Sequence, residues 1–170
     1  MEEYYFYRQG KCNASTERIN LPKGLSIKKQ IPNPFVSGMS QMQIGYKMWL
    51  SHFILSFLNR GFHRTFVEYN LYDNNQIVSK AVLISKVPIY DFLPHDGIHL
   101  AYCETIPSAR GRGYYPLLLD YIQNAHPNNN LYMIVKKDNI PSIKGIEKAG
   151  FVRYAEGGRV NGTFKITSYL

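Results

Sequence analysis

The sequence predicts an α/β domain with a mixed, mainly antiparallel sheet flanked by helices. Two hairpin signals support the antiparallel part, since Asp73-Asn74-Asn75 and Asn161-Gly162 each separate two strand-like runs. Between these hairpins, the strand-like residues 98–105 and 131–137 enclose a helical segment. A strand, a helix and a strand in this order predict a right-handed crossover and a parallel pair.

The remaining elements follow from periodicity and from local stop signals. Strands are expected at residues 4–7, 25–31, 64–72, 76–87, 98–105, 131–137, 151–155 and 163–169. Helices are expected at residues 40–59, 114–125 and 140–149. The first helix carries an apolar stripe and begins with a capping-box pattern at Ser40. In the last helix Asn139 is a good N-cap and Gly150 a good C-terminal stop.

Composition indicates one globular domain. The 170 residues are enough for a sizeable core, and 45% of them are apolar against 19% charged. The most apolar long stretch, residues 42–58, is too polar to span a bilayer. No basic segment precedes an apolar run at the start, so we expect a cytoplasmic protein without a membrane partner. A homodimer is left open.

The net charge of +8 has several explanations. Nucleic acid is not favoured as a partner, because no basic run exceeds two residues. An anionic cofactor or a generally basic surface explains the charge equally well. Cys12 and Cys103 lack a CxxC pattern, so neither a disulfide framework nor a zinc site is expected. His95 and His99 do not suggest a metal site either, because Pro94 makes a helix there improbable.

The sharpest chemical feature is the run Arg110-Gly111-Arg112-Gly113 between a strand and a helix. Glycines let the backbone approach a phosphate closely, and the unpaired N–H groups and dipole at a helix N-terminus favour an anion. Arg110 and Arg112 add cationic donors. In isolation the same run fits a basic turn with solvated arginines or a segment that contacts RNA.

Two motifs together resemble the GCN5-related N-acetyltransferase (GNAT) family. Arg110 and Gly113 match that family's core motif at a strand-to-helix turn. A second signature follows about thirty residues on, matched by Asn139, Ser142, Lys148, Gly150 and Phe151. The resemblance covers residues 62–170. It implies a GNAT-type fold with splayed central parallel strands, a cofactor-binding core over residues 62–170 and an acceptor-shaping part over residues 1–61.

The resemblance also implies acetyl-coenzyme A as co-substrate, without a metal. The backbone N–H groups from Arg110 to Tyr115, including that of Tyr114, are expected to bind the pyrophosphate. The pantetheine arm is expected between strands 98–105 and 131–137, with contacts from Thr105, Ile106, Asn139 and Ser142.

Two residues depart from the family pattern. Tyr115 replaces a small residue, so its ring must point away from the phosphates. Ile146 replaces a tyrosine that often protonates the leaving thiolate, and Tyr132 and Tyr154 are candidates by type for that role.

A general base is needed if the acceptor is an ammonium, because only the neutral amine attacks a thioester. His99 is one candidate, and strict alternation would place it on one strand face with Ala101, Cys103 and Thr105. Glu104, on the other face by the same alternation, and Glu68 are further candidates, as is ordered water. An acyl-cysteine at Cys103 is not favoured, because a buried strand cysteine is usually a small apolar residue.

The predicted reaction is acetyl transfer from acetyl-coenzyme A to a primary amine by direct attack. An amino sugar or an amino-acid-like metabolite is favoured, while polyamines and protein N-termini stay open. The alternative is a non-catalytic module that senses coenzyme A or binds an acidic partner.

Overall fold

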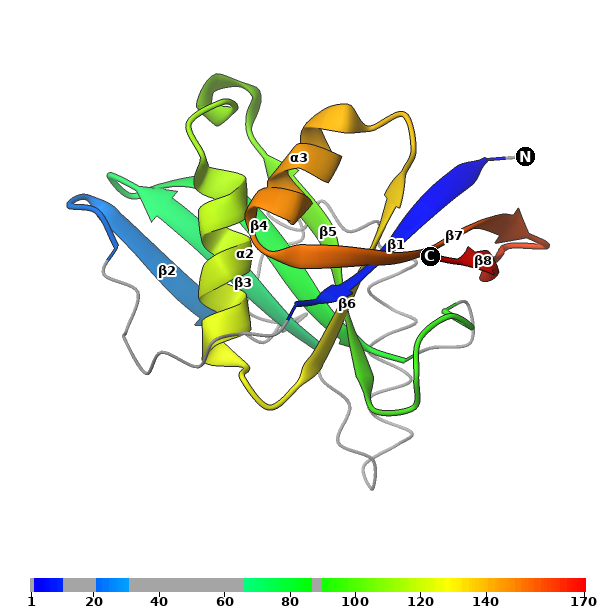
Figure 1. The fold of residues 1–170 in the computed structure, drawn as a ribbon. Coiled ribbons are helices and arrows are strands. Elements are labelled where there is room, and N and C mark those ends of the chain that lie inside the picture. Colours follow the sequence, from blue (N-terminus) through cyan, green and yellow to red (C-terminus); the bar gives the residue numbers. More distant parts are fainter. Residues whose placement is uncertain (1, 11–20, 31–65, 87–89) are drawn as a thin grey trace.

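The computed structural model describes residues 2–10, 21–30, 66–86 and 90–170. In these residues eight strands form one sheet in the order β2-β3-β4-β5-β6-β1-β7-β8 (Figure 1). The strands are β1 (Glu3–Gln9), β2 (Leu25–Gln30), β3 (Phe66–Asp73), β4 (Gln76–Ser85), β5 (Gly97–Thr105), β6 (Asn130–Lys136), β7 (Phe151–Val160) and β8 (Thr163–Tyr169). The helices are α2 (Tyr114–Ala125) and α3 (Ile140–Lys148), and a 3-10 turn, η2, spans Pro107–Ala109. The helix expected at residues 40–59 lies outside the described residues.

Both predicted hairpins are confirmed. Asn74 and Asn75 between β3 and β4 have φ of 46° and 70°, and Asn161 and Gly162 between β7 and β8 have φ of 49° and 81°. Positive φ at both central residues is the two-residue turn that matches the twist of paired strands. β7 continues to Val160, beyond the expected end at residue 155, because it pairs with β1 on one side and β8 on the other.

The N-terminal strand lies inside the sheet. β1 is antiparallel to both β6 and β7, and Phe6 and Tyr7 are completely buried. Apolar residues at consecutive positions suit a strand that is covered on both faces. Residues 3–9, which the sequence assigned to the N-terminal, acceptor-shaping part of the domain, therefore contribute a strand to the same sheet as β3 to β8.

The two helices pack on the same face of the sheet (Figure 1). Their apolar stripes bury Leu118, Leu119 and Ile122 of α2 and Ile146 of α3 against that face. The opposite face carries a second apolar cluster, made by Val82, Ile84, Tyr90, Leu93 and Ala101. We call these the helix face and the open face.

The parallel pair is confirmed, and it separates early. β5 and β6 are paired only at Gly97–Asn130, Ile98–Leu131 and His99–Tyr132. Beyond His99, no strand among the described residues pairs with the edge of β5 that faces β6. This is the predicted splay of the central strands.

A β-bulge interrupts β5 within the splayed part. Ala101 pairs with Val82 and Glu104 pairs with Lys80, so Tyr102 and Cys103 stand opposite the single residue Ala81. Tyr102 has a φ of 48°, in the left-handed region. The extra residue reverses the alternation of side chains along the rest of the strand.

Candidate functional site: a phosphate cradle beside splayed strands

The turn between β5 and α2 is built on two glycines in left-handed conformation. Gly111 has a φ of 78° and Gly113, the N-cap of α2, a φ of 81°. A Cβ added at either position would meet no atom of the described part of the chain within 4 Å. The positive φ values favour glycine at both positions, and the absence of neighbouring atoms leaves the space in front of the turn open.

This turn has the properties of an anion site. Gly113 has no side chain to cap the first N–H groups of α2, so those groups remain available to a ligand. The dipole of the 12-residue helix adds positive potential at the same place. Arg110 and Arg112 are both exposed beside it.

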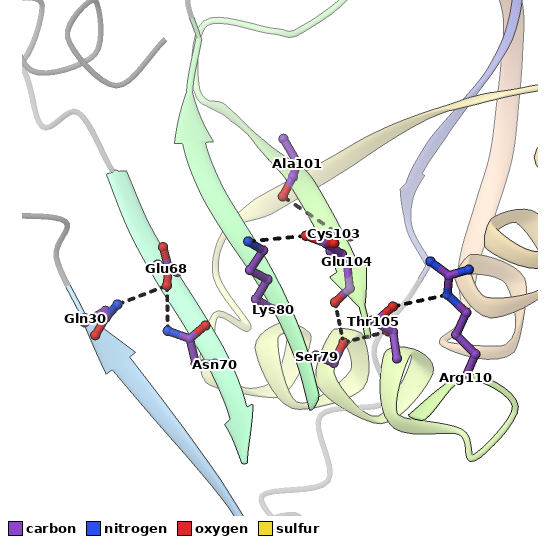
Figure 2. A network of polar contacts seen from close by, with 10 residues as sticks. All are labelled: Gln30, Glu68, Asn70, Ser79, Lys80, Ala101, Cys103, Glu104, Thr105 and Arg110. Atoms are coloured by element: carbon purple, nitrogen blue, oxygen red, sulfur yellow. Dashed lines mark hydrogen bonds and ion pairs between the residues drawn. The ribbon is translucent and has the colours of Figure 1, made fainter. Parts of the chain in front are cut away.

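Two side-chain contacts hold the cradle in place. The Nε of Arg110 donates to the carbonyl oxygen of Thr105 over 3.2 Å, closing the turn onto the end of β5 (Figure 2). The hydroxyl of Tyr114, the first residue of α2, donates to Oδ2 of Asp73 over 2.6 Å. This second bond ties the cradle to the β3–β4 turn. The sequence did not indicate it, because the partners are far apart along the chain.

The ring of Tyr115 points away from the cradle and toward α3. It packs against Gly145, and its hydroxyl lies 3.5 Å from Oγ of Ser142. The backbone N–H of Tyr115 thus stays at the cradle while its side chain enters the helix pair. Gly145, inside the helix expected at residues 140–149, is a signal in the sequence that could have pointed to this contact.

The second motif forms the start of α3. Oδ1 of Asn139 accepts a hydrogen bond from the backbone N–H of Ser142 over 3.3 Å, which confirms Asn139 as the N-cap. With the oxygen engaged, the amide NH2 of the exposed Asn139 is its free donor. Ser142 directs its hydroxyl toward Tyr115.

Backbone groups at the end of β5 are partly occupied. The N–H of Ile106 donates to the carbonyl of Val78 over 3.1 Å, and the N–H of Ala109 donates to the carbonyl of Ile106. The sequence had suggested that Ile106 contacts a pantetheine arm, but its N–H is therefore not free to donate to one. The unpaired edge of β5 from Leu100 to Thr105 offers backbone groups instead.

His99 lies in an apolar pocket of the open face. Its ring packs edge-on against those of Tyr90 and Phe92, with distances between ring centroids of 4.4 Å and 5.6 Å. Burial lowers the pKa of His99 to about 3, and its buried Nδ1 has no hydrogen-bond partner among the described residues. A group with such a low pKa is a weak base, which argues against His99 as the acceptor of an ammonium proton.

Glu104 lies on the open face, not on the face predicted by simple alternation. It forms an ion pair with Lys80 at 3.3 Å, and its side chain is 40% exposed (Figure 2). Cys103, which was expected beside His99, packs in the helix-face core instead. The bulge at Tyr102 is the cause of both changes.

Glu68 and Asn70 of β3 continue the polar row across the open face (Figure 2). Oε1 of Glu68 accepts from Nδ2 of Asn70 over 2.6 Å and from Nε2 of Gln30 over 3.0 Å. Glu68 is only 5% exposed. Of the three predicted base candidates, Glu104 is thus the most accessible carboxylate.

Other site types receive no support from the described residues. Within them no three His, Cys, Asp or Glu side chains gather as a metal site. No helix among them is long and apolar enough to cross a membrane. A cavity of about 450 Å³ lies between Arg8–Gly10, Asn130–Tyr132 and Val152, beside the first residues of β6.

The same arrangement of strands and helices occurs in solved structures of acetyltransferases. The chain has the GNAT fold. A GCN5-related N-acetyltransferase from Sphaerobacter thermophilus superimposes with a TM-score of 0.62 at 11% identity, covering 91% of this chain and 49% of that one. A tandem GNAT protein from the clavulanic acid biosynthesis pathway gives 0.59 at 13% identity, covering 92% and 51%. A GNAT-family acetyltransferase from Colwellia psychrerythraea gives 0.53 at 16% identity, covering 92% and 54%.

These similarities extend to structure and not to sequence. The chain spans about half the length of these solved structures. No family model matches the sequence, and no curated protein is similar to it. At identities this low, structural similarity establishes the fold alone. The activity has to be argued from the residues of the site.

Proposed function

We propose that the protein transfers an acetyl group from acetyl-coenzyme A to a primary amine of a small molecule. The observation that carries this proposal is the open cradle at Gly111 and Gly113, next to the point where β5 and β6 separate. The cradle suits a pyrophosphate, and the unpaired edge of β5 suits the amide groups of a pantetheine arm.

Each residue of the site then has a defined part. The N–H groups at residues 111–115 bind the pyrophosphate, and Arg112 supplies positive charge. The N–H of Arg110, which the sequence had included, donates to the carbonyl oxygen of Pro107 over 3.3 Å instead. The amide NH2 of Asn139 donates to the pantetheine arm. A backbone N–H on the open edge of β5 polarises the thioester carbonyl as the amine attacks it.

Glu104 is our choice for the group that accepts the proton of the amine, directly or through water. It is a partly exposed carboxylate at the splayed end of β5. His99 is less suitable, because its pKa of about 3 makes it a weak base. An amino sugar or an amino-acid-like metabolite is the acceptor class we favour.

A thermal-shift titration tests cofactor binding without knowledge of the acceptor. Acetyl-coenzyme A at about 100 times its dissociation constant should stabilise the fold by roughly 2.7 kcal/mol. Gly113→Trp should abolish this shift. Gly162→Trp is the matched control, because Gly162 also has a φ of 81° and open space around a Cβ. No shift of the wild-type protein at millimolar ligand would contradict the proposal.

One alternative has an observation in its favour. The net charge of +8 and the apolar, buried Ile146 also fit a module that senses coenzyme A or holds an acidic partner. Thioester consumption with a panel of amines separates the two functions. Binding of acetyl-coenzyme A with no turnover of any amine would favour the module.

A further inference from the structure

The open face carries aromatic side chains over β6 and β7 and a row of polar side chains over β3 to β5. Tyr132 and Tyr154, which the sequence suggested for the leaving thiolate, pack together in the aromatic part with ring centroids 6.0 Å apart. In the polar row, Asn70 of β3 is opposite Lys80 of β4, and Lys80 is opposite Glu104 of β5 (Figure 2). The row therefore runs from the splayed end of β5 to β3.

Glu68 is a buried carboxylate at the β3 end of this row. Its Oε1 accepts hydrogen bonds from the side-chain amides of Asn70 and Gln30, over 2.6 Å and 3.0 Å, and both donors are neutral. Its Oε2 has no hydrogen-bond partner among the described residues. A buried carboxylate destabilises a fold unless a cation or several donors are paired with it. The bonds to Oε1 therefore leave Glu68 only partly compensated.

The nearby cations are engaged with other groups. Lys80 pairs with Glu104 at 3.3 Å. Lys28 of the neighbouring strand β2 lies over the ring of Tyr72, with its Nζ 4.8 Å from the ring centroid. No ion pair between described residues includes Glu68. Within the described part of the chain, the charge of Glu68 thus has no counter-ion.

Asn70 adds a second unpaired acceptor beside Glu68. It is 1% exposed, and its buried Oδ1 has no hydrogen-bond partner among the described residues. Buried acceptors without a donor are rare in folded proteins, and a bound ligand or ion is one explanation for them. Two neighbouring acceptors, one of them charged, call for a cation with several N–H donors. An ammonium group has three donors and no acceptor, whereas a hydroxyl has one proton and no charge.

The position of these acceptors connects them to acetyl transfer. Neighbouring strands lie about 4.8 Å apart, and β4 separates β3 from β5, so the backbones at Asn70 and Glu104 are about 10 Å apart. We propose that Glu68 and Asn70 bind a second ammonium group of the acceptor while its first amine reacts beside Glu104. The inference rests on the proposed function, which places the attacking amine at Glu104. The acceptor is then a molecule with two cationic nitrogens, such as a linear diamine or a diamino sugar.

Matched amines separate the second charge from the rest of the molecule. Octanediamine and octylamine have the same carbon chain, and only the diamine carries a second ammonium. Calorimetric titration with coenzyme A present measures binding, and thioester consumption with acetyl-coenzyme A measures turnover. The wild type should prefer the diamine about tenfold or more in affinity and in kcat/KM. A diamino sugar against glucosamine is the second pair, and the pair with the larger preference identifies the kind of acceptor.

Three variants assign the preference to this site. Glu68→Gln keeps the size of the side chain and an oxygen for both amides but removes the charge, so it should lose the preference. Asn70→Ala removes the second acceptor and should reduce the preference. Asp120→Asn removes the same charge from an exposed position of α2 and should keep it. Thermal unfolding adds a readout without ligand: because the charge of Glu68 has no counter-ion, Glu68→Gln should not lower the Tm, whereas the loss of a purely structural carboxylate would lower it.

Each remaining result contradicts a different statement. If both members of each pair behave alike in the wild type, or if Glu68→Gln keeps the preference, the second ammonium site is wrong, and acetyl transfer to either amine leaves the proposed function standing. If Glu68→Gln slows transfer to both members equally, Glu68 acts on the attacking amine and the inference is overturned. If no amine consumes the thioester, the proposed function is wrong and the inference is overturned with it.

Discussion

The contact between Tyr115 and Gly145 predicts an unusual dependence of one substitution on another. Glycine inside a helix normally costs about 1 kcal/mol relative to alanine, so Gly145→Ala should stabilise an ordinary helix. Here the new Cβ would overlap the Tyr115 ring, which is itself enclosed by α2 and α3. Overpacking of this kind costs about 1–3 kcal/mol.

The net effect can be worked out for each background. In the wild type, the gain of about 1 kcal/mol offsets part of the clash, so Gly145→Ala should lower the free energy of unfolding by about 0–2 kcal/mol. In Tyr115→Ala the ring is absent, and the same substitution should raise it by about 1 kcal/mol. The coupling between the two positions is therefore about 1–3 kcal/mol.

Denaturant unfolding of the four proteins measures this coupling directly. For a chain of this length each kcal/mol also corresponds to a shift of about 2–4 °C in Tm. The control is the pair Gly145→Ala with Tyr121→Ala, which should be additive because Tyr121 packs against Tyr69. If Gly145→Ala is equally stabilising with and without the Tyr115 ring, the packing described for this ring is wrong.

Three further predictions concern His99, Glu104 and Tyr114. The pKa of His99 is about 3 in the folded protein and about 6.5 when unfolded, so the unfolded chain takes up the proton first as pH falls. When the pH falls from 7 to 5, the free energy of unfolding of the wild type should thus decrease by about 2 kcal/mol more than that of His99→Phe. Denaturant unfolding at both pH values measures this, and equal decreases would refute the burial of His99. Glu104→Gln should lower kcat by about two to four orders of magnitude with unchanged acetyl-coenzyme A binding, whereas wild-type turnover would transfer the role to Glu68 or water. Tyr114→Phe removes the bond to Asp73 and should raise the KM for acetyl-coenzyme A about two- to tenfold while kcat stays unchanged; steady-state kinetics that show a loss in kcat alone would contradict a role in positioning the cradle.

Features with local causes were predictable from the sequence. The asparagine turn at Asn74 and Asn75, the Asn161-Gly162 turn and the Asn139 cap depend on the conformational preferences of the residues involved, so adjacent residues determine them. The cradle at Gly111 and Gly113 belongs to the same class, because its left-handed backbone and the following helix lie within one short segment. The parallel pair also followed from the order of elements alone.

Features that depend on distant residues appeared only in the tertiary structure. β1 has the composition of a covered strand, but nothing in residues 3–9 specifies β6 and β7 as its neighbours. The bulge at Tyr102 depends on pairing with β4, and by reversing the alternation it moved Cys103 to the helix face and Glu104 to the open face. Sequence periodicity assumes an unbroken pleat, so a single inserted residue is enough to defeat it.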